Sequence, residues 1–171
     1  RMPRTLLLMR HAKSDWPTGA GNDFDRSLAD RGNKDAHRIG RWIQEHNWLP
    51  DQVICSPAKR AKQTIDHVCQ KIGMDSRAVE YDKRIYEADQ SHLLTVLRET
   101  NSVTARLLMV GHNPSFSDLL NFLCPDATYP TVDRPMPTAA LAVIALKASW
   151  SVLYQGSGEL MSLILPHTLP R

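Results

Sequence analysis

The sequence has few cysteines, and those it has stand far apart. Cys55, Cys69 and Cys124 form an odd set without a close pair among 171 residues. A disulfide framework normally uses an even set, and a metal knuckle needs closely spaced pairs. This cysteine pattern therefore argues against both, and it suits a reducing cytoplasm, where we expect the chain to reside.

Long apolar runs are also missing. The longest, such as Leu6–Met9 and Ala139–Leu146, are far shorter than the roughly 20 residues that a membrane span requires. Leu6–Met9 leads directly into charged residues with no small-residue cleavage site, so we expect no secretory leader and no membrane partner. We interpret Arg1, ahead of Met2, as an addition made for expression. The length predicts a single domain over residues 2–171.

Clustered charge and clustered histidine are absent as well. The net charge is +3, with 21 Lys and Arg against 18 Asp and Glu, but these residues are scattered along the chain. A nucleic-acid binder usually concentrates its basic residues in one stripe, so we expect no nucleic-acid partner. Five histidines show no pair at ligand spacing, which predicts neither a metal site nor a cofactor. They are His37, His46, His67, His92 and His167.

What the sequence does contain is an alternation of apolar runs and helical periodicity. Short apolar runs of this kind predict strands, and these are Thr5–Met9, Gln52–Cys55, Ala78–Tyr81, Leu107–Val110, Leu141–Leu146 and Leu160–Leu165. Helices are predicted from near Ala29 to near His46, from a Ser56–Pro57 start through Ile72, from near Ser91, and over Phe116–Leu123. Arg10–Asp25 and Cys124–Pro137 are predicted to be irregular because they carry prolines or glycines.

This alternation is typical of an α/β fold, a three-layer sandwich with a mostly parallel central sheet flanked by helices. In such sheets, the loops that leave the carboxyl ends of the strands gather at one edge and build the site. Arg10–His11, Ser56–Arg60 and Gly111–His112 each follow a predicted strand. We therefore expect these three segments to converge.

The residues in these segments are suited to phosphoryl transfer. A neutral imidazole at His11, with its other ring nitrogen held by a backbone carbonyl, can attack phosphorus. Arg10 and Arg60 can bind phosphate oxygens bidentately, and the N-terminus of the helix carrying Arg60 adds positive potential. His112 can donate a further hydrogen bond to the phosphoryl group. The pattern predicts a phosphatase site in which phosphate or sulfate can bind.

The proton donor to the leaving group is predicted to be Glu87. It lies between predicted elements, in the segment Arg84–Ala88, where a carboxyl can reach a cleft. A general acid near neutral pH needs a raised pKa, which burial favours and neighbouring arginines oppose. Sequence alone does not decide which of the two effects is larger.

Four motifs resemble those of the histidine phosphatase superfamily, whose fold is that of the phosphoglycerate mutases. Leu8–Ala12 is similar to its Arg-His signature, although Ala12 stands where Gly is usual. Leu28, Gly32 and Ala36 fit its helix-entry pattern, and Ser56–Thr64 and Gly111–Pro114 resemble its second arginine and second histidine motifs. Arg10–Trp16, reading Arg-His-Ala-Lys-Ser-Asp-Trp, and Pro137–Ala140 are similar to the small phosphohistidine phosphatases of the SixA type.

The resemblance implies that His11 carries a phosphohistidine intermediate and that Arg10, Arg60 and His112 bind phosphate. It implies that Glu87 donates the proton, and that the substrate is a phosphorylated molecule, with a phosphohistidine-bearing protein favoured. Ser14 matches a serine position of the family and is a weaker candidate for phosphate contact. Pro17 stands where the related mutases carry a phosphate-binding asparagine, and Ala139 where Gly is expected.

Other functions fit parts of the same pattern. A small-molecule phosphomonoester phosphatase or a mutase of the phosphoglycerate type would use the same pocket, although a mutase normally needs more chain for a lid. A phosphate-sensing module without turnover fits the substitution at Pro17. A cysteine phosphatase does not fit, because its nucleophile and arginine are separated by five residues, whereas four separate Cys55 and Arg60.

Overall fold

The apolar run near the N-terminus forms the central strand of a sheet. In the computed structural model, which describes residues 3–16, 21–129 and 135–171, this strand is β1 (Arg4–Arg10). Its residues Leu6 to Met9 have no exposed surface. A strand covered on both faces needs apolar residues at consecutive positions, which is why the run is continuous rather than alternating.

Six strands form one mixed sheet in the order β3-β2-β4-β1-β5-β6. They are β1, β2 (Gln52–Cys55), β3 (Glu80–Tyr81), β4 (Arg106–Gly111), β5 (Leu141–Leu146) and β6 (Gly158–Ile164). The first four strands pair in parallel, whereas β5 is antiparallel to both β1 and β6. The register places Arg10 opposite Gly111, so β1 and β4 end side by side.

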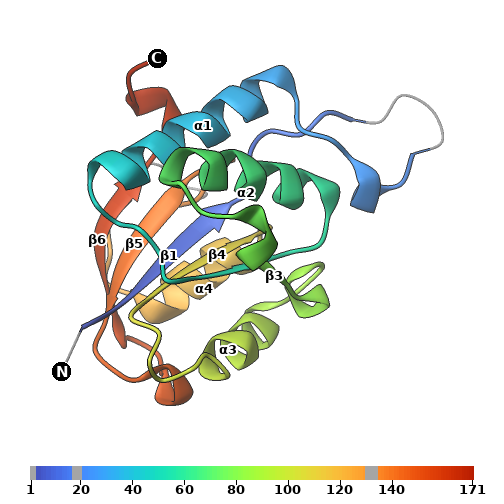
Figure 1. Cartoon of the computed structure of the whole chain (residues 1–171). Helices are drawn as coiled ribbons and strands as arrows, with labels where there is room; N and C mark the ends of the chain where they lie inside the picture. The colour runs from blue at the N-terminus through green and yellow to red at the C-terminus, as the bar shows by residue number, and fades with distance from the viewer. Residues whose placement is uncertain (1–2, 17–20, 130–134) are drawn as a thin grey trace.

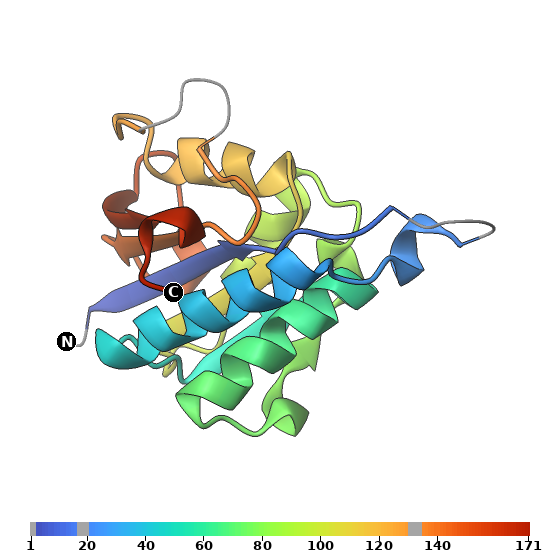
Figure 2. The same ribbon diagram turned by 90° about the horizontal axis from the view of Figure 1, so that it is seen from above.

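Helices cover both faces of this sheet, as predicted. Helices α1 (Asp30–Glu45) and α2 (Lys59–Ile72) lie side by side over one face, and α3 (Gln90–Arg98) and α4 (Ser115–Leu123) cover the other (Figures 1 and 2). Each face of the sheet packs against its helices in a separate hydrophobic core, and alternate residues of β1 contribute to the two cores. Leu7 and Met9 pack with α1 and α2, and Leu6 and Leu8 with α3 and α4. The result is a three-layer α/β sandwich with a mostly parallel central sheet, as predicted.

The structure corrects several predicted boundaries. The strand predicted from Ala78 is shorter, because Ser76–Ala78 forms a 3-10 turn and pairing begins only at Glu80. The predicted loop Arg10–Asp25 contains a 3-10 turn at Asp23–Asp25, stabilised by a hydrogen bond from the Asp25 N–H to the Asn22 side chain. Pro17 and the middle of the Cys124–Pro137 segment lie outside the described residues. Among the residues described, no helix is long and apolar enough to cross a membrane.

The start of the second helix also differs from the prediction. Helix α2 begins at Lys59, and Ala58 precedes it without a side-chain cap. The prediction that Ser56 caps this helix and Pro57 opens it is therefore wrong. The Ser56 hydroxyl accepts a 3.3 Å hydrogen bond from the Ala58 N–H and is joined to His112 at 2.7 Å. Arg60 remains in the first turn of the helix.

Candidate active site

His11 follows the last residue of β1 and is held by its own backbone and by two neighbouring segments. Its N–H donates to the Gly111 carbonyl at 2.9 Å, and its carbonyl accepts from the Ala139 N–H at 3.0 Å. Within the side chain, Nδ1 lies 2.8 Å from the Ala12 carbonyl oxygen. A carbonyl can only accept, so Nδ1 carries the proton of the neutral ring and the Nε2 lone pair is left for chemistry.

The surroundings of His11 keep it neutral. Its side chain is buried, and burial lowers its pKa well below 6.5, with further lowering from His112, Arg10 and Arg60. A cationic imidazole among guanidinium groups would be unfavourable in a poorly solvated place. His11 is therefore a free base over the physiological pH range, as a nitrogen nucleophile requires.

His112 stands beside His11, at the carboxyl end of the adjacent strand β4. The two ring centroids are 5.1 Å apart. Burial, followed by the charges of Arg60 and Arg10, lowers the pKa of His112 to about 3. Its Nε2 is joined to the Ser56 hydroxyl at 2.7 Å, and its Nδ1 is buried with no hydrogen-bond partner among the described residues.

The two predicted arginines lie near both histidines, since the charges of Arg10 and Arg60 lower the pKa values of the two imidazoles. The Arg10 guanidinium donates to the Met136 carbonyl at 3.3 Å. Arg60 is only 6% exposed although it carries a full charge. The structure thus brings together the four side chains that the sequence predicted to converge.

The helix that carries Arg60 also holds the loop after His11. The Thr64 hydroxyl donates to the Arg60 carbonyl at 2.7 Å and accepts from the Ala12 N–H at 3.0 Å. The side chain of the preceding residue, Gln63, accepts from the Leu28 N–H at 2.7 Å. These bonds explain why the Ser56–Thr64 motif extends beyond its arginine.

Asp23 and Tyr86 belong to the site and were missed by the sequence reasoning. Arg60 donates to the Asp23 carbonyl at 2.7 Å and to its carboxylate at 3.0 Å, and the Tyr86 hydroxyl donates to the same carboxylate oxygen at 2.8 Å. The Tyr86 ring lies 5.5 Å from the ring of His112. The only signals in the sequence were that Tyr86 precedes Glu87 and that Asp23 falls in the loop after His11.

These contacts set the charge states of the two residues. Partial burial raises the pKa of Asp23, but hydrogen bonds from Tyr86, Arg26 and Arg60 outweigh it and lower the pKa to about 2. Burial, with the hydrogen bond to Asp23, raises the pKa of Tyr86 to about 12. Asp23 is thus an anion that binds Nη2 of Arg60. Without Asp23, this guanidinium nitrogen would be available to a phosphate oxygen.

Glu87 and Ser14 are placed differently from these residues. Glu87 is exposed, makes no hydrogen bond with any described residue, and has a backbone φ of 53°, in the left-handed region that non-glycine residues rarely adopt. The Ser14 hydroxyl accepts from Arg26 at 2.7 Å, and Ser14 makes no hydrogen bond with the four central residues. Phosphate contact by Ser14 stays a prediction.

The remaining histidines are not all scattered. His37 and His67 bring their ring centroids within 4.3 Å of each other, and His67 Nε2 is joined to the Asn33 side-chain oxygen at 2.7 Å. This pair forms across α1 and α2, so sequence spacing could not show it. Within the described part of the chain, no three His, Cys, Asp or Glu side chains lie close enough together to hold a metal ion.

The fold and the site define a class of enzyme, one that transfers phosphoryl groups at the carboxyl edge of an α/β sheet. Comparison with known proteins agrees. Residues 6–101 match the sequence profile of the histidine phosphatase superfamily (branch 1). An uncharacterized protein of Mycobacterium tuberculosis is 32% identical over 163 residues, covering 92% of this chain and 99% of that protein.

Relatives of the SixA type are also similar to this chain. Phosphohistidine phosphatase SixA of Escherichia coli is 27% identical over 145 residues, covering 84% of this chain and 86% of that protein. The solved structure of a SixA-type protein of Nakamurella multipartitia superposes with a TM-score of 0.81 at 28% identity, covering 96% of both chains. The chain belongs to the histidine phosphatase superfamily and is a phosphatase of the histidine-nucleophile type.

Proposed function

We propose that this phosphatase works through a phosphohistidine on His11 and that its substrate is a phosphohistidine carried by a protein. The observation that supports the first part is the hydrogen bond from His11 Nδ1 to the Ala12 carbonyl. It directs the unprotonated Nε2 away from the backbone, beside Arg10, Arg60 and His112. Nucleophile and cationic cage are therefore present in one place.

The proposed reaction has two displacements. In the first, Nε2 of His11 forms a bond to phosphorus while the bond from phosphorus to the substrate's leaving atom breaks, and the leaving group takes up a proton. In the second, the oxygen of a water molecule forms a bond to phosphorus while the bond from Nε2 of His11 to phosphorus breaks, which releases inorganic phosphate and regenerates His11. Arg10 and Arg60 compensate the charge on the phosphoryl oxygens in both steps.

His112 and Ser56 act together in this proposal. If the Ser56 hydroxyl donates to Nε2 of His112, the ring proton of neutral His112 lies on Nδ1, which has no other described partner. That N–H then donates to a phosphoryl oxygen. The buried Nδ1, which has no hydrogen-bond partner among the described residues, thereby gains one.

The proton for the leaving group comes from Glu87 in this proposal. Its left-handed backbone is a conformation that costs about 1–2 kcal/mol for a residue with a side chain. Strain of this kind is typical of functional positions. An imidazole leaving group needs less help from an acid than an alkoxide, because it is a much weaker base, so Glu87 matters least for a phosphohistidine substrate.

The nature of the relatives supports a protein phosphohistidine as substrate. SixA of Escherichia coli carries the name phosphohistidine phosphatase and covers most of this chain. We further propose that residues 2–171 form a single domain that acts in the cytoplasm without a metal ion. The three cysteines are unpaired and buried, which suits a reducing compartment.

The decisive experiment is to trap the intermediate. Brief mixing with a phosphoramidate or p-nitrophenyl phosphate, followed by alkaline denaturation, is expected to leave an acid-labile, base-stable phosphoryl group on the His11 peptide, detected by mass spectrometry. His11→Ala is expected to lose at least about 1000-fold in kcat, because the covalent route is removed. Full activity in His11→Ala would show that another residue is the nucleophile.

A further inference from the structure

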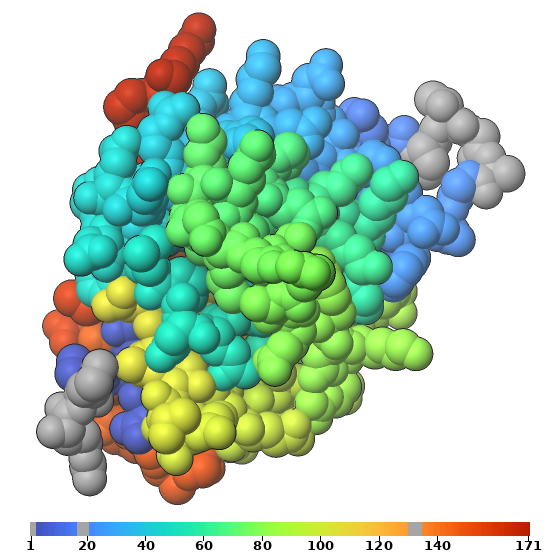
Figure 3. All heavy atoms as spheres, in the orientation of Figure 1, coloured from blue at the N-terminus to red at the C-terminus, as the bar shows by residue number. Residues whose placement is uncertain are grey.

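A surface rich in basic side chains lies along α1, and none of the residues that line it belongs to the site around His11. A cavity of about 760 Å³ opens between α1 and the C-terminal 3-10 turn η5 (Pro166–Thr168). The C-terminal segment lies beside α1 at the upper left of both the ribbon and the space-filling view (Figures 1 and 3). The cavity, here called the basic groove, is lined by Arg31, Lys34, His37, Arg38, Arg41, His167, Leu169 and Arg171.

Positive charge in the basic groove is only partly neutralised. The single acidic side chain bound among these residues is Asp35, which is nearly buried and contacts Arg38 at 2.9 Å and Arg31 at 3.7 Å. Lys34 and Arg41 form no ion pair with any described residue. Burial lowers the pKa of His37, and the nearby charges of His67, Lys71 and Arg41 lower it further.

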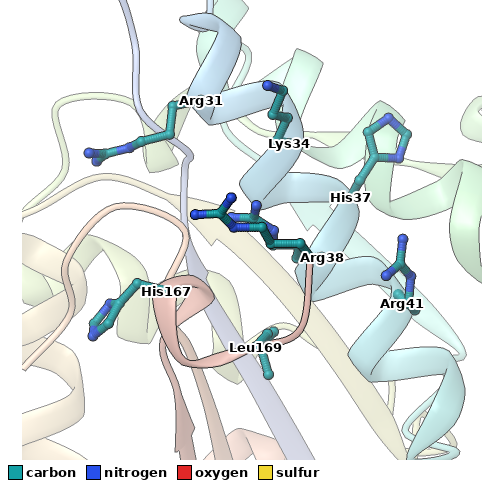
Figure 4. Close-up of a pocket in the computed structure, with 8 residues that line it drawn as sticks. Arg31, Lys34, His37, Arg38, Arg41, His167 and Leu169 are labelled. Atoms are coloured by element: carbon teal, nitrogen blue, oxygen red, sulfur yellow. The ribbon is translucent and has the colours of Figure 1, made fainter.

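The cations are arranged along a line. Arg31, Lys34, Arg38 and Arg41 recur at helical spacing on one side of α1, so the first and last are separated by about 15 Å along the helix axis. Figure 4 shows their side chains extending in different directions rather than converging on one point. A single phosphate would be met by convergent groups, whereas an extended chain with several carboxylates would meet these cations one after another.

The basic groove leads to the catalytic segment. A second cavity of about 330 Å³ shares Arg31, Arg38 and His167 with it and is also lined by Pro137 and Thr138. These two residues directly precede Ala139, whose N–H donates to the His11 carbonyl. A protein substrate with its phosphoryl group at His11 could thus lay an adjoining segment along α1.

We propose that the basic groove docks an acidic segment of the phosphoprotein substrate. The proposal rests on the proposed function, and it assigns a recognition role to residues that take no part in the chemistry. The occupant of the groove is a polypeptide segment with several Asp or Glu residues near the phosphohistidine of the substrate. Nucleic acid, the other polyanion that a basic surface can attract, is an outcome of the test.

The test uses two synthetic peptides that differ only in charge. Both carry one phosphohistidine, followed by a run of glutamates in one and of glutamines in the other. The wild-type protein is expected to show a KM about tenfold lower for the acidic peptide at low salt, with equal kcat, and to lose this preference as salt rises. The variant Lys34→Glu/Arg41→Glu is expected to lose the preference while keeping wild-type turnover of the neutral peptide and of p-nitrophenyl phosphate.

A matched control reverses two exposed lysines elsewhere, Lys83→Glu/Lys147→Glu, and is expected to keep the preference. Equal KM values for the two peptides in the wild-type protein, or an unchanged preference in Lys34→Glu/Arg41→Glu, would overturn the docking proposal. A DNA oligonucleotide that binds the groove more tightly than the acidic peptide would also overturn it.

Failure of the proposed function can be told apart from failure of the docking proposal. The unphosphorylated acidic peptide is titrated by fluorescence anisotropy, which requires no turnover. Binding that Lys34→Glu/Arg41→Glu weakens about tenfold supports the groove even if neither phosphopeptide is hydrolysed. Absence of binding refutes the groove even if both are hydrolysed.

Discussion

Asp23 places a carboxylate on the arginine that is proposed to bind phosphate. Its oxygen contacts Arg60 at 3.0 Å, and half of its side-chain surface is exposed. A phosphate that binds Arg60 must displace this carboxylate or accept its repulsion. Asp23 therefore lowers the affinity of the site for anions while it keeps the buried guanidinium paired in the free protein.

We predict that Asp23→Asn tightens binding of inorganic phosphate by about threefold, a modest gain because the exposed ion pair is screened by solvent. Isothermal titration calorimetry measures the change, with Asp25→Asn as control. Weaker phosphate binding in Asp23→Asn would mean instead that the carboxylate positions Arg60 for its ligand.

His112 links the site to the pH dependence of stability. Its pKa is about 3 in the folded protein, well below the ordinary value near 6.5 that it regains on unfolding. Below pH 6.5 the unfolded chain therefore binds a proton that the folded protein does not, so stability falls as the pH falls from 6.5 towards 3. His11, whose pKa is also lowered, acts in the same direction.

We predict that the free energy of unfolding depends less steeply on pH in His112→Asn, by roughly 1.4 kcal/mol per pH unit below pH 6. Urea unfolding at several pH values between 6.5 and 4 measures this, and His46→Asn is the control. Parallel pH profiles for the wild-type protein and His112→Asn would contradict the lowered pKa of His112.

At the scale of elements, the site depends on where three strands end. Strands β1, β2 and β4 are parallel neighbours, so His11, Ser56 and His112 all follow carboxyl ends at one edge. The segment between β3 and α3 then carries Tyr86 to the same site, and the next residue, Glu87, has a left-handed backbone conformation. Stability and activity are expected to oppose one another at that residue.

We predict that Glu87→Gly raises the free energy of unfolding by about 1 kcal/mol, because glycine adopts a positive φ without strain. Its kcat/KM for an alkyl phosphate is expected to fall by about 100-fold, with little loss for p-nitrophenyl phosphate, whose leaving group needs no acid. Glu87→Gln is the matched control. It should lose the same activity without gaining stability, and unchanged alkyl phosphatase activity in both variants would exclude Glu87 as the acid.

At the scale of the whole molecule, the helical layer formed by α1 and α2 packs directly against the loop that follows His11. Gly32 lies in the first turn of α1, and a Cβ atom there would overlap the Lys13 carbonyl. That carbonyl also accepts from the Ala29 N–H at 2.9 Å. The contact fixes the distance between the helix and the loop that follows His11.

We predict that Gly32→Ala lowers the free energy of unfolding by about 2 kcal/mol, because the helix and the loop must separate to admit the methyl group. It is also expected to reduce kcat by shifting the loop that carries Ala12, the hydrogen-bond acceptor of His11. Gln44→Ala, an exposed substitution on the same helix, should change neither quantity. Wild-type kcat in Gly32→Ala would show that the site does not depend on this contact.

The sequence by itself determined the three-layer arrangement of helices and sheet and the convergence of Arg10, His11, Arg60 and His112. Both follow from local information, because a buried strand needs a continuous apolar run and polar residues that follow parallel strands share one edge. The positions of these four side chains could therefore be predicted without coordinates.

Only the tertiary structure decided which groups bind one another. Three contacts join residues more than 25 positions apart: the ion pair of Asp23 with Arg60, the hydrogen bond between Ser56 and His112, and the ring contact of His37 with His67. The sequence had instead assigned Ser56 to the start of a helix. The groove along α1 likewise exists only because the C-terminal turn packs beside that helix. Hydrogen-bond partners depend on side-chain distances of a few ångströms, which periodicity and motif spacing do not specify.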